Sequence, residues 1–167
     1  MLPAFAPFRQ ARARGRIGSR MKRSMPTRPI RQVIHGRRLV SAPPAMTVRE
    51  AARLMASEKV GALPVVESGR LIGIFTERDA LFRVLARGLD PDATALAEVM
   101  TADPVTVDAR RPLNHALHLM YDGGFRHVPV VDDGGVVGVV SARDALGPEI
   151  TQFEAELQQR DDLSEKM

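Results

Sequence analysis

The residues of this chain that could do chemistry occur twice in the same arrangement. Thr76 is followed three residues later by Asp79, and Ser141 is followed at the same spacing by Asp144. A hydroxyl residue between a strand and a helix leaves backbone N–H groups free to attract phosphate, and the aspartate can accept two hydrogen bonds from a ribose diol. The same spacing is also a helix capping box, which contributes about 1 kcal/mol to the helix. The two uses are compatible, because we expect the capping aspartate to keep a second oxygen free to face a cleft.

The two turns belong to a longer internal repeat. When residues 40–81 are laid over residues 105–146 without a gap, thirteen of the forty-two positions are identical. A fixed period of this kind is typical of a duplicated supersecondary unit, in which the two copies bury their apolar faces together. We therefore expect the function to lie between the copies.

Each copy predicts the order strand, helix, strand, strand, helix. Apolar residues at helical spacing predict the first helix, and two short apolar runs separated by turn residues predict a hairpin. A polar turn then begins a second helix, which Gly147-Pro148 shortens in the second copy. The predicted elements are helices 48–55 and 113–120, strands 63–67, 71–75, 128–132 and 136–140, and second helices from 76 to 86 and from 141.

These motifs make the chain resemble the stand-alone tandem CBS-domain proteins, or Bateman modules, from about Pro29 to Pro148. The resemblance rests on motifs that recur in order in both copies: 61–66 and 126–131, then 73–79 and 138–144, with the lead-in 98–101 and the segment 103–107. It implies an α/β (α+β) fold of two tandem β-α-β-β-α repeats that pack through their sheets with pseudo-two-fold symmetry. It also implies a homodimer that senses adenine nucleotides (AMP, ADP or ATP), NAD or S-adenosylmethionine, and does not catalyse a reaction.

The resemblance further implies two pockets, each drawing on both copies. One pocket would hold ligand with Ser141, Asp144 and Val139 and with Val60 and Gly61. The other would use Thr76, Asp79 and Ile74, with Arg126 or His127 reaching the phosphate.

The two copies differ beside these turns. Arg126 and His127 precede the hairpin of the second copy, and a guanidinium suits a phosphate because it can bind two oxygens at once. Gly61 and Ala62 stand at the equivalent positions of the first copy, where small residues suit a flat base lying on the backbone. The alternative for Arg126 is a solvated pair with an acidic neighbour, Asp122 or Asp132.

Charge and composition suggest a division of the chain. Residues 1–38 hold eleven basic residues and no acidic one, whereas the remainder carries a net charge of −7. We expect a basic, disordered extension that is a binding arm, a presequence or a dispensable upstream segment before Met25. A role with nucleic acid is disfavoured, because basic residues alone give only non-specific attraction. The expected division is 1–28 extension, 29–88 first repeat, 89–94 linker, 95–148 second repeat and 149–167 amphipathic helix.

Other classes of function find little support. The chain has no cysteine and no apolar run long enough to cross a bilayer, so we expect a soluble, cytoplasmic protein. The residue types of a catalytic triad are present in Ser141, His127 and Asp144, but the sequence has no turn that would expose the serine, so we expect no catalysis. We also expect no metal site at His115 and His118, because both lie on the polar side of their helix. The main alternative is an adaptor that binds an unknown effector protein through residues 149–167. A nucleic-acid-associated protein acting through the basic arm is the weaker one.

Overall fold

Two hairpins form the centre of the computed structural model, which describes residues 28–145. Each turn has two residues with positive φ, Ser68-Gly69 and Asp133-Gly134, and this turn matches the twist of the strands that it joins. Each hairpin also carries one register shift, at Val65/Val66 and at Val130/Val131. The predicted hairpins are confirmed, with the strands β1 Ala62–Glu67, β2 Arg70–Thr76, β5 His127–Asp132 and β6 Gly135–Ser141.

A third, short strand completes each sheet. β3 (Thr101–Ala102) pairs antiparallel with β2, and β4 (Val107–Asp108) pairs parallel with β5. The first strand expected in the first copy is reduced to a single bridge between Ala42 and Val65. The order of elements in each copy otherwise follows the prediction.

One long helix packs on each hairpin. α2 (Val48–Glu58) begins at a capping box in which Thr47 and Glu50 exchange hydrogen bonds, and α5 (Leu113–Gly123) begins after Pro112. Both helices end at a residue in the left-handed conformation, Lys59 and Gly124. Each helix buries the apolar face that its sequence predicts, namely Val48, Ala51 and Met55 in α2 and Leu113, Ala116 and Met120 in α5.

The second helix of the first copy changes its winding along its length. α3 (Glu77–Asp79) is followed by a π-helical stretch η1 (Ala80–Val84) and a 3-10 turn η2 (Leu85–Arg87), which ends at Gly88. The equivalent segment of the second copy begins with η3 (Ala142–Ala145). The expected extension before residue 28 and the expected helix at 149–167 lie outside the described residues.

Each copy is completed by the segment that precedes the other copy. α1 (Ile30–Ile34) packs in the core of the second copy with Val128, Val130 and Val140. α4 (Leu96–Val99) packs in the core of the first copy with Leu63 and Phe75. The connection through residues 35–41 therefore leads from one core to the other.

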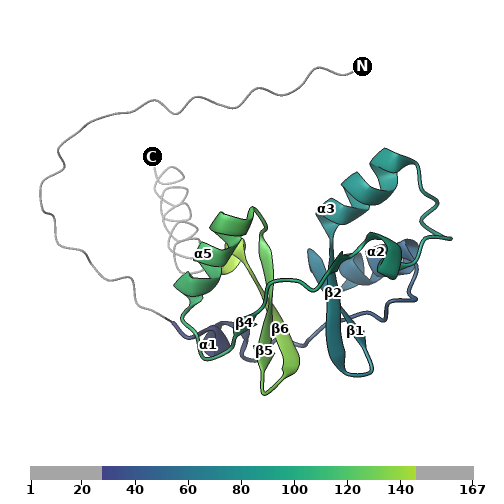
Figure 1. Ribbon diagram of the computed structural model, residues 1–167. Helices are drawn as coiled ribbons and strands as arrows, with labels where there is room; N and C mark the ends of the chain where they lie inside the picture. The colour runs from purple at the N-terminus through teal and green to yellow at the C-terminus, as the bar shows by residue number, and fades with distance from the viewer. Residues whose placement is uncertain (1–27, 146–167) are drawn as a thin grey trace, which may run out of the picture.

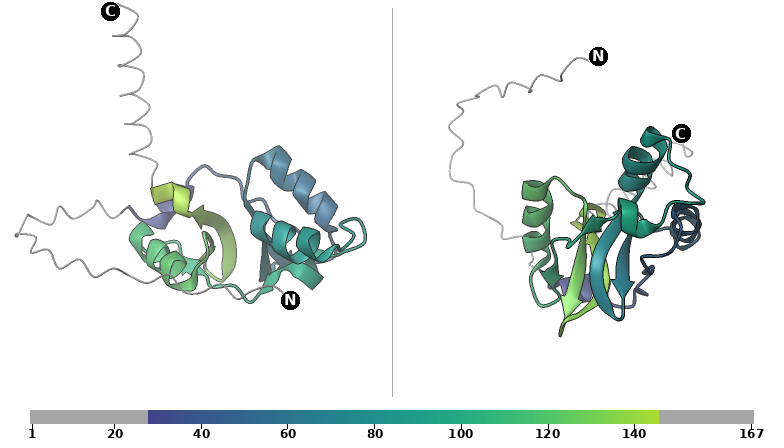
Figure 2. Two further views of the ribbon diagram at one scale, coloured as in Figure 1. Left: turned by 90° about the horizontal axis from the view of Figure 1, so that it is seen from above. Right: turned by 45° about the vertical axis from the view of Figure 1, so that its right-hand side comes forward.

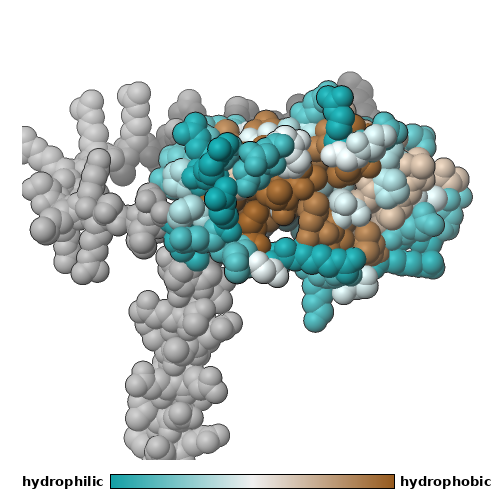
Figure 3. Space-filling model, turned by 90° about the horizontal axis from the view of Figure 1, so that it is seen from below, coloured by the Kyte–Doolittle hydropathy of each residue, from teal (hydrophilic) through white to brown (hydrophobic). Residues whose placement is uncertain are grey.

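The two halves meet through their sheets. Figure 1 shows β2 and β6 side by side in the middle, with α5 on one flank and α2 and α3 on the other. Figure 2 shows the same order from above, with the helices on the outside. The underside carries apolar residues across its middle, between hydrophilic borders (Figure 3). The mixed α and β fold of two repeats confirms the predicted fold class.

Candidate functional site

The two hydroxyl–aspartate turns have the same internal geometry. The N–H and the Oγ1 of Thr76 donate to Asp79 Oδ2 at 2.9 and 2.7 Å. The N–H and the Oγ of Ser141 donate to Asp144 Oδ2 at 2.6 and 3.2 Å. The full capping box is present at Thr76, whose Oγ1 also accepts from the Asp79 N–H at 3.2 Å. At Ser141 the structure shows the half of the arrangement in which the aspartate accepts.

The second oxygen of each aspartate already has a partner, which corrects one expectation. We expected this oxygen to be free to face a cleft. Instead, Oδ1 of Asp79 lies 3.1 Å from Nε of Arg83, and Oδ1 of Asp144 lies 2.7 Å from Nη1 of Arg37. A ribose diol must therefore compete with an arginine at either aspartate, because both aspartate side chains are largely buried and have few other accessible directions.

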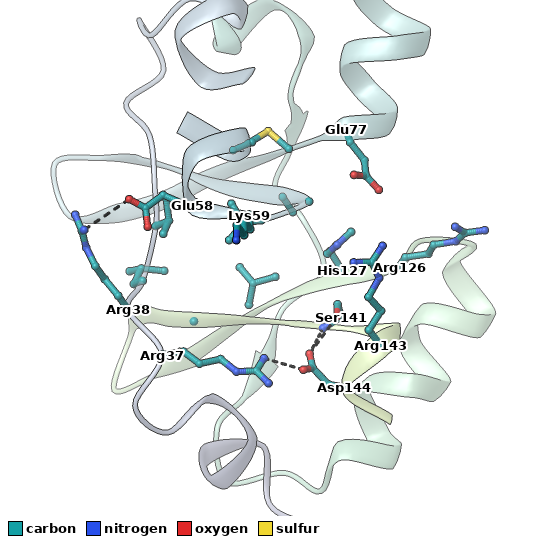
Figure 4. Close-up of a pocket in the computed structure, with 18 of the residues that line it drawn as sticks. Arg37, Arg38, Glu58, Lys59, Glu77, Arg126, His127, Ser141, Arg143 and Asp144 are labelled. Carbon is teal, nitrogen blue, oxygen red and sulfur yellow. Dashed lines mark hydrogen bonds and ion pairs between the residues drawn. The ribbon is translucent and has the colours of Figure 1, made fainter. Parts of the chain in front are cut away.

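A cleft of about 1050 Å³ lies between the two copies beside Asp144 (Figure 4). Its volume is at the upper end of the range for small-molecule sites. It brings together seven of the ten site residues predicted from the sequence. These are Val60, Gly61, Arg126, His127, Val139, Ser141 and Asp144.

The other three predicted residues do not line this cleft. Ile74 is buried, and Thr76 and Asp79 lie at the turn that Arg83 covers. We expected Arg126 and His127 to serve that second pocket, but the structure places both on the wall of the Asp144 cleft. Arg126 and His127 thus join the residues predicted for the Asp144 pocket, whereas Thr76 and Asp79 lie outside the lining of this cavity.

The cleft is cationic. Its charged lining residues are Arg37, Arg38, Lys59, Arg126 and Arg143 against Glu58, Glu77 and Asp144. With His127 neutral, this composition leaves an excess of two positive charges, which attracts anions. Figure 4 shows Arg37 and Arg38 on one side and Arg126, His127 and Arg143 on the other, with Asp144 between them.

The arginines and the lysine of the lining differ in how firmly they are held. Arg37 pairs with Asp144, and Arg38 lies 3.8 Å from Glu58. Arg126, exposed at the cleft, makes no ion pair within residues 28–145. The surface pair with Asp122 or Asp132 that was the alternative for Arg126 does not form in the described part of the chain, and its guanidinium is available to a ligand.

His127 is the titratable group of the cleft whose environment is most altered. Burial lowers the pKa of its imidazole below the usual value, and the Glu77 carboxylate opposes this shift. Arg143 and Arg126 lower the pKa further, whereas Asp144 raises it. His127 is therefore mostly neutral near pH 7 and would gain a proton more readily beside an added anion.

An apolar wall faces the charged groups. Gly61 contributes to it with bare backbone, and a Cβ atom built there would lie 3.0 Å from Nε2 of His127. Its carbonyl accepts a hydrogen bond from the Glu77 N–H at 3.1 Å, which fixes the strand against the second helix. The remaining apolar lining comes from both copies and from the connection before them, namely Leu39, Val40, Met55, Val60, Ala62 and Val139.

Sequence reasoning missed the residues that the connection contributes. Arg37 and Arg38 fall in the predicted first repeat but were not among its predicted site residues, although both line the cleft. Glu77 and Arg143 were overlooked because attention fell on the hydroxyl and aspartate of each turn. Their signal was present, because both are charged residues inside the Thr76–Asp79 and Ser141–Asp144 turns.

Within residues 28–145, no group of three or more His, Cys, Asp or Glu side chains is placed to hold a metal ion. None of the helices in these residues has the length and apolar character needed to cross a membrane.

Comparison with known proteins adds independent findings. The model of the CBS domain family matches residues 30–86 and 96–147. The chain is 41% identical over 101 residues to the CBS domain-containing protein YhcV of Bacillus subtilis, covering 60% of this chain and 71% of that protein. It covers only 22% and 57% of two other curated relatives, and so spans less than two thirds of their length.

Solved structures show the same fold. A putative signal-transduction protein with CBS domains from Burkholderia ambifaria is similar with a TM-score of 0.67 and 31% identity, covering 72% of this chain and 92% of that one. The CBS domain protein PAE2072 from Pyrobaculum aerophilum, solved in complex with AMP, has a TM-score of 0.64 and 32% identity. That comparison covers 70% of this chain and 88% of the Pyrobaculum protein.

Proposed function

This chain belongs to the CBS-domain family, and from that premise we propose that it is a regulatory module that binds an adenine nucleotide in the Asp144 cleft. The AMP complex of the Pyrobaculum relative supports this choice of ligand. The observation that carries the proposal is the set of residues that line the cleft. A capped aspartate, a cationic wall and an apolar wall with bare backbone line one cavity between the repeats.

Each part of a nucleotide has a matching group in the cleft. Asp144 accepts from the ribose diol, because a carboxylate can take both hydroxyl protons. Arg126, His127 and Arg143 face the phosphate, and the guanidiniums can bind its oxygens in pairs. The base lies against Val60, Gly61 and Val139, where small side chains and bare backbone suit the flat face of the ring.

The charge of the cleft favours ligands that carry phosphate. AMP, ADP, ATP and NAD are anions, whereas S-adenosylmethionine carries a positively charged sulfonium. An excess of two positive charges attracts the first group and opposes the last. We propose AMP, ADP or ATP ahead of NAD, and S-adenosylmethionine last.

Ligand binding has a direct route to the rest of the molecule. The diol competes with Arg37 for Asp144, and Arg37 belongs to the connection between the core that holds α1 and the core of the first copy. Releasing Arg37 changes what holds that connection in place. The signal is the resulting shift between two states, and its size is set by the difference in the ligand's affinity for them.

A homodimer is proposed as the form in which the signal is read. The second helix of the first copy exposes Leu81, Phe82 and Leu85, whose exposed fractions are 50%, 55% and 71%. Apolar side chains gathered along one exposed helix are typical of a surface that another protein covers. The effector would read the arrangement of the two chains, and no catalytic step is proposed.

Isothermal titration calorimetry tests the proposal. The full chain is titrated with AMP, ADP, ATP, NAD and S-adenosylmethionine, and we expect heat from at least one of the adenine mononucleotides. The same ligand should raise the melting temperature in proportion to the logarithm of its concentration, because it binds the folded state alone. No heat and no shift from any of the five would contradict the proposed function and favour the adaptor alternative.

A further inference from the structure

We propose that each chain holds one nucleotide, at Asp144, and that Arg83 keeps the equivalent position at Asp79 closed. This inference rests on the proposed function and assigns it to one of two positions that the repeat makes equivalent in sequence. It turns on how differently the two arginines beside the aspartates are held.

Arg83 is fixed on several sides. Its Nε lies 3.1 Å from Asp79 Oδ1. Its Nη1 donates to the carbonyls of Val99 and Met100 at 3.0 and 2.7 Å, and its Nη2 donates to Thr101 Oγ1 at 3.2 Å. The guanidinium thus ties the helix to the end of α4 and the start of β3. A ribose at Asp79 would have to break this arrangement, since the fixed guanidinium cannot leave one partner without disturbing the others.

Arg37 is held far more loosely. Its ion pair with Asp144 is the only ion pair or hydrogen bond that its side chain makes within residues 28–145, and 53% of its side chain is exposed. It lies in the connection after α1, beside Gly36, whose φ is +74°. The guanidinium can therefore swing into solvent or toward a phosphate when a diol takes Asp144.

The sequence itself accounts for the difference between the two aspartates. Four residues after Asp79 stands Arg83, at the spacing that lets the two side chains pair on one helix face. Four residues after Asp144 stands Pro148, which has no charge to offer. The second copy therefore has no counterpart of the Arg83 clamp.

The charges near the two positions differ in the same sense. Arg37 and Arg38 of the Asp144 side correspond, 65 residues on, to Ala102 and Asp103 on the Asp79 side. The segment that leads into the second copy thus has no guanidinium at the positions equivalent to Arg37 and Arg38. Asp79 and Arg83 therefore have a structural role, and Thr76 is the N-cap of α3.

The test is the stoichiometry of binding by the full chain. Calorimetry with AMP is expected to give one site per chain. Asp144→Asn should lower the affinity at least tenfold, and the matched Asp79→Asn should leave affinity and stoichiometry within twofold of wild type. Two sites per chain, or a loss of affinity in Asp79→Asn alone, would overturn the assignment while leaving nucleotide binding intact.

A second variant tests the role given to Arg83. Arg83→Met frees Asp79 Oδ1 and removes the bonds to the Val99 and Met100 carbonyls, so a second and weaker binding event is expected at high AMP concentration. Circular dichroism establishes that the variant is folded before the titration is read. A folded Arg83→Met chain that still shows a single event would contradict the clamp. No binding of any adenine nucleotide by wild type would remove the proposed function and this inference together.

Discussion

Arg37 and Asp144 form an ion pair of 2.7 Å. It joins the connection after α1 to η3, the turn that follows β6 in the second repeat. The pair lies inside the cleft, where Asp144 also holds the end of β6 through Ser141. One carboxylate therefore caps a helix, anchors the connection and is the proposed ribose acceptor. A ligand that takes this carboxylate therefore also loosens the connection.

Replacing Arg37 separates competition from phosphate binding. Adenosine has the diol and no phosphate, so Arg37→Met should bind adenosine about two- to fivefold more tightly, because the ribose no longer displaces an ion pair worth up to about 1 kcal/mol. Competition titration against AMP measures the change. Equal adenosine affinities in the two proteins would show that Arg37 and the ribose do not compete.

Filling the apolar wall should block the base. Gly61→Leu places a side chain against His127 and Glu77 at the mouth of the cleft, and we expect at least a tenfold loss of AMP affinity. The exposed Ala97 on α4 lies outside the cleft lining, so Ala97→Leu is the matched control and should bind as wild type does. Undiminished binding by a folded Gly61→Leu protein would move the base away from this wall.

His127 should make stability depend on pH. Burial lowers the pKa of the folded imidazole below that of the unfolded chain, so the unfolded state takes up its proton first as the pH falls. Stability should therefore be unaffected by this group above its unfolded pKa and should decline as the pH falls from there toward the folded pKa. Denaturant unfolding between pH 7.5 and 5 measures the slope.

His127→Gln provides the comparison for that slope. Glutamine keeps a polar side chain without a titratable group in this range, and the variant should lose less stability over the same interval than wild type does. The groups around the imidazole, Glu77, Arg143, Asp144 and Arg126, remain in both proteins. Identical slopes would mean that His127 is not the group responsible.

The exposed helix should control assembly. Phe82 is 55% exposed and lies under the Arg78 guanidinium, whose carbon is 5.5 Å from the ring centroid. Phe82→Glu would bury a charge in the apolar interface, so the Kd of the proposed dimer should rise at least tenfold. Analytical ultracentrifugation compares it with Val137→Glu, an exposed apolar position on β6. A monomeric wild-type protein, or a dimer indifferent to Phe82→Glu, would place the interface elsewhere or remove it.

The repeat was the part of the structure most readily predicted from sequence. Local signals predicted the hairpins, because a turn such as Asp133-Gly134 favours one geometry and the short apolar runs on either side of it form the buried strands. The caps at Thr76 and Ser141 could also be predicted, because each depends on two residues three positions apart. Such features depend on a few neighbouring residues.

Long-range features were less accessible. The packing of α1 on the second copy depends on contacts between distant segments, and no local pattern specifies it. The ion pair between Arg37 and Asp144 joins residues more than one hundred positions apart, so no local pattern predicts it. Arg83 is different, because its spacing from Asp79 predicts an ion pair, and that signal was available.

A crystal structure of the full chain with AMP decides whether the nucleotide occupies the Asp144 cleft. We predict density in the cleft, with the ribose hydroxyls on Asp144, the phosphate toward Arg126 and Arg143, and the Arg37 guanidinium moved off Asp144 Oδ1. AMP seated at Asp79 with Arg83 displaced, or a cleft that remains empty at saturating AMP while Arg37 keeps its ion pair, would contradict it.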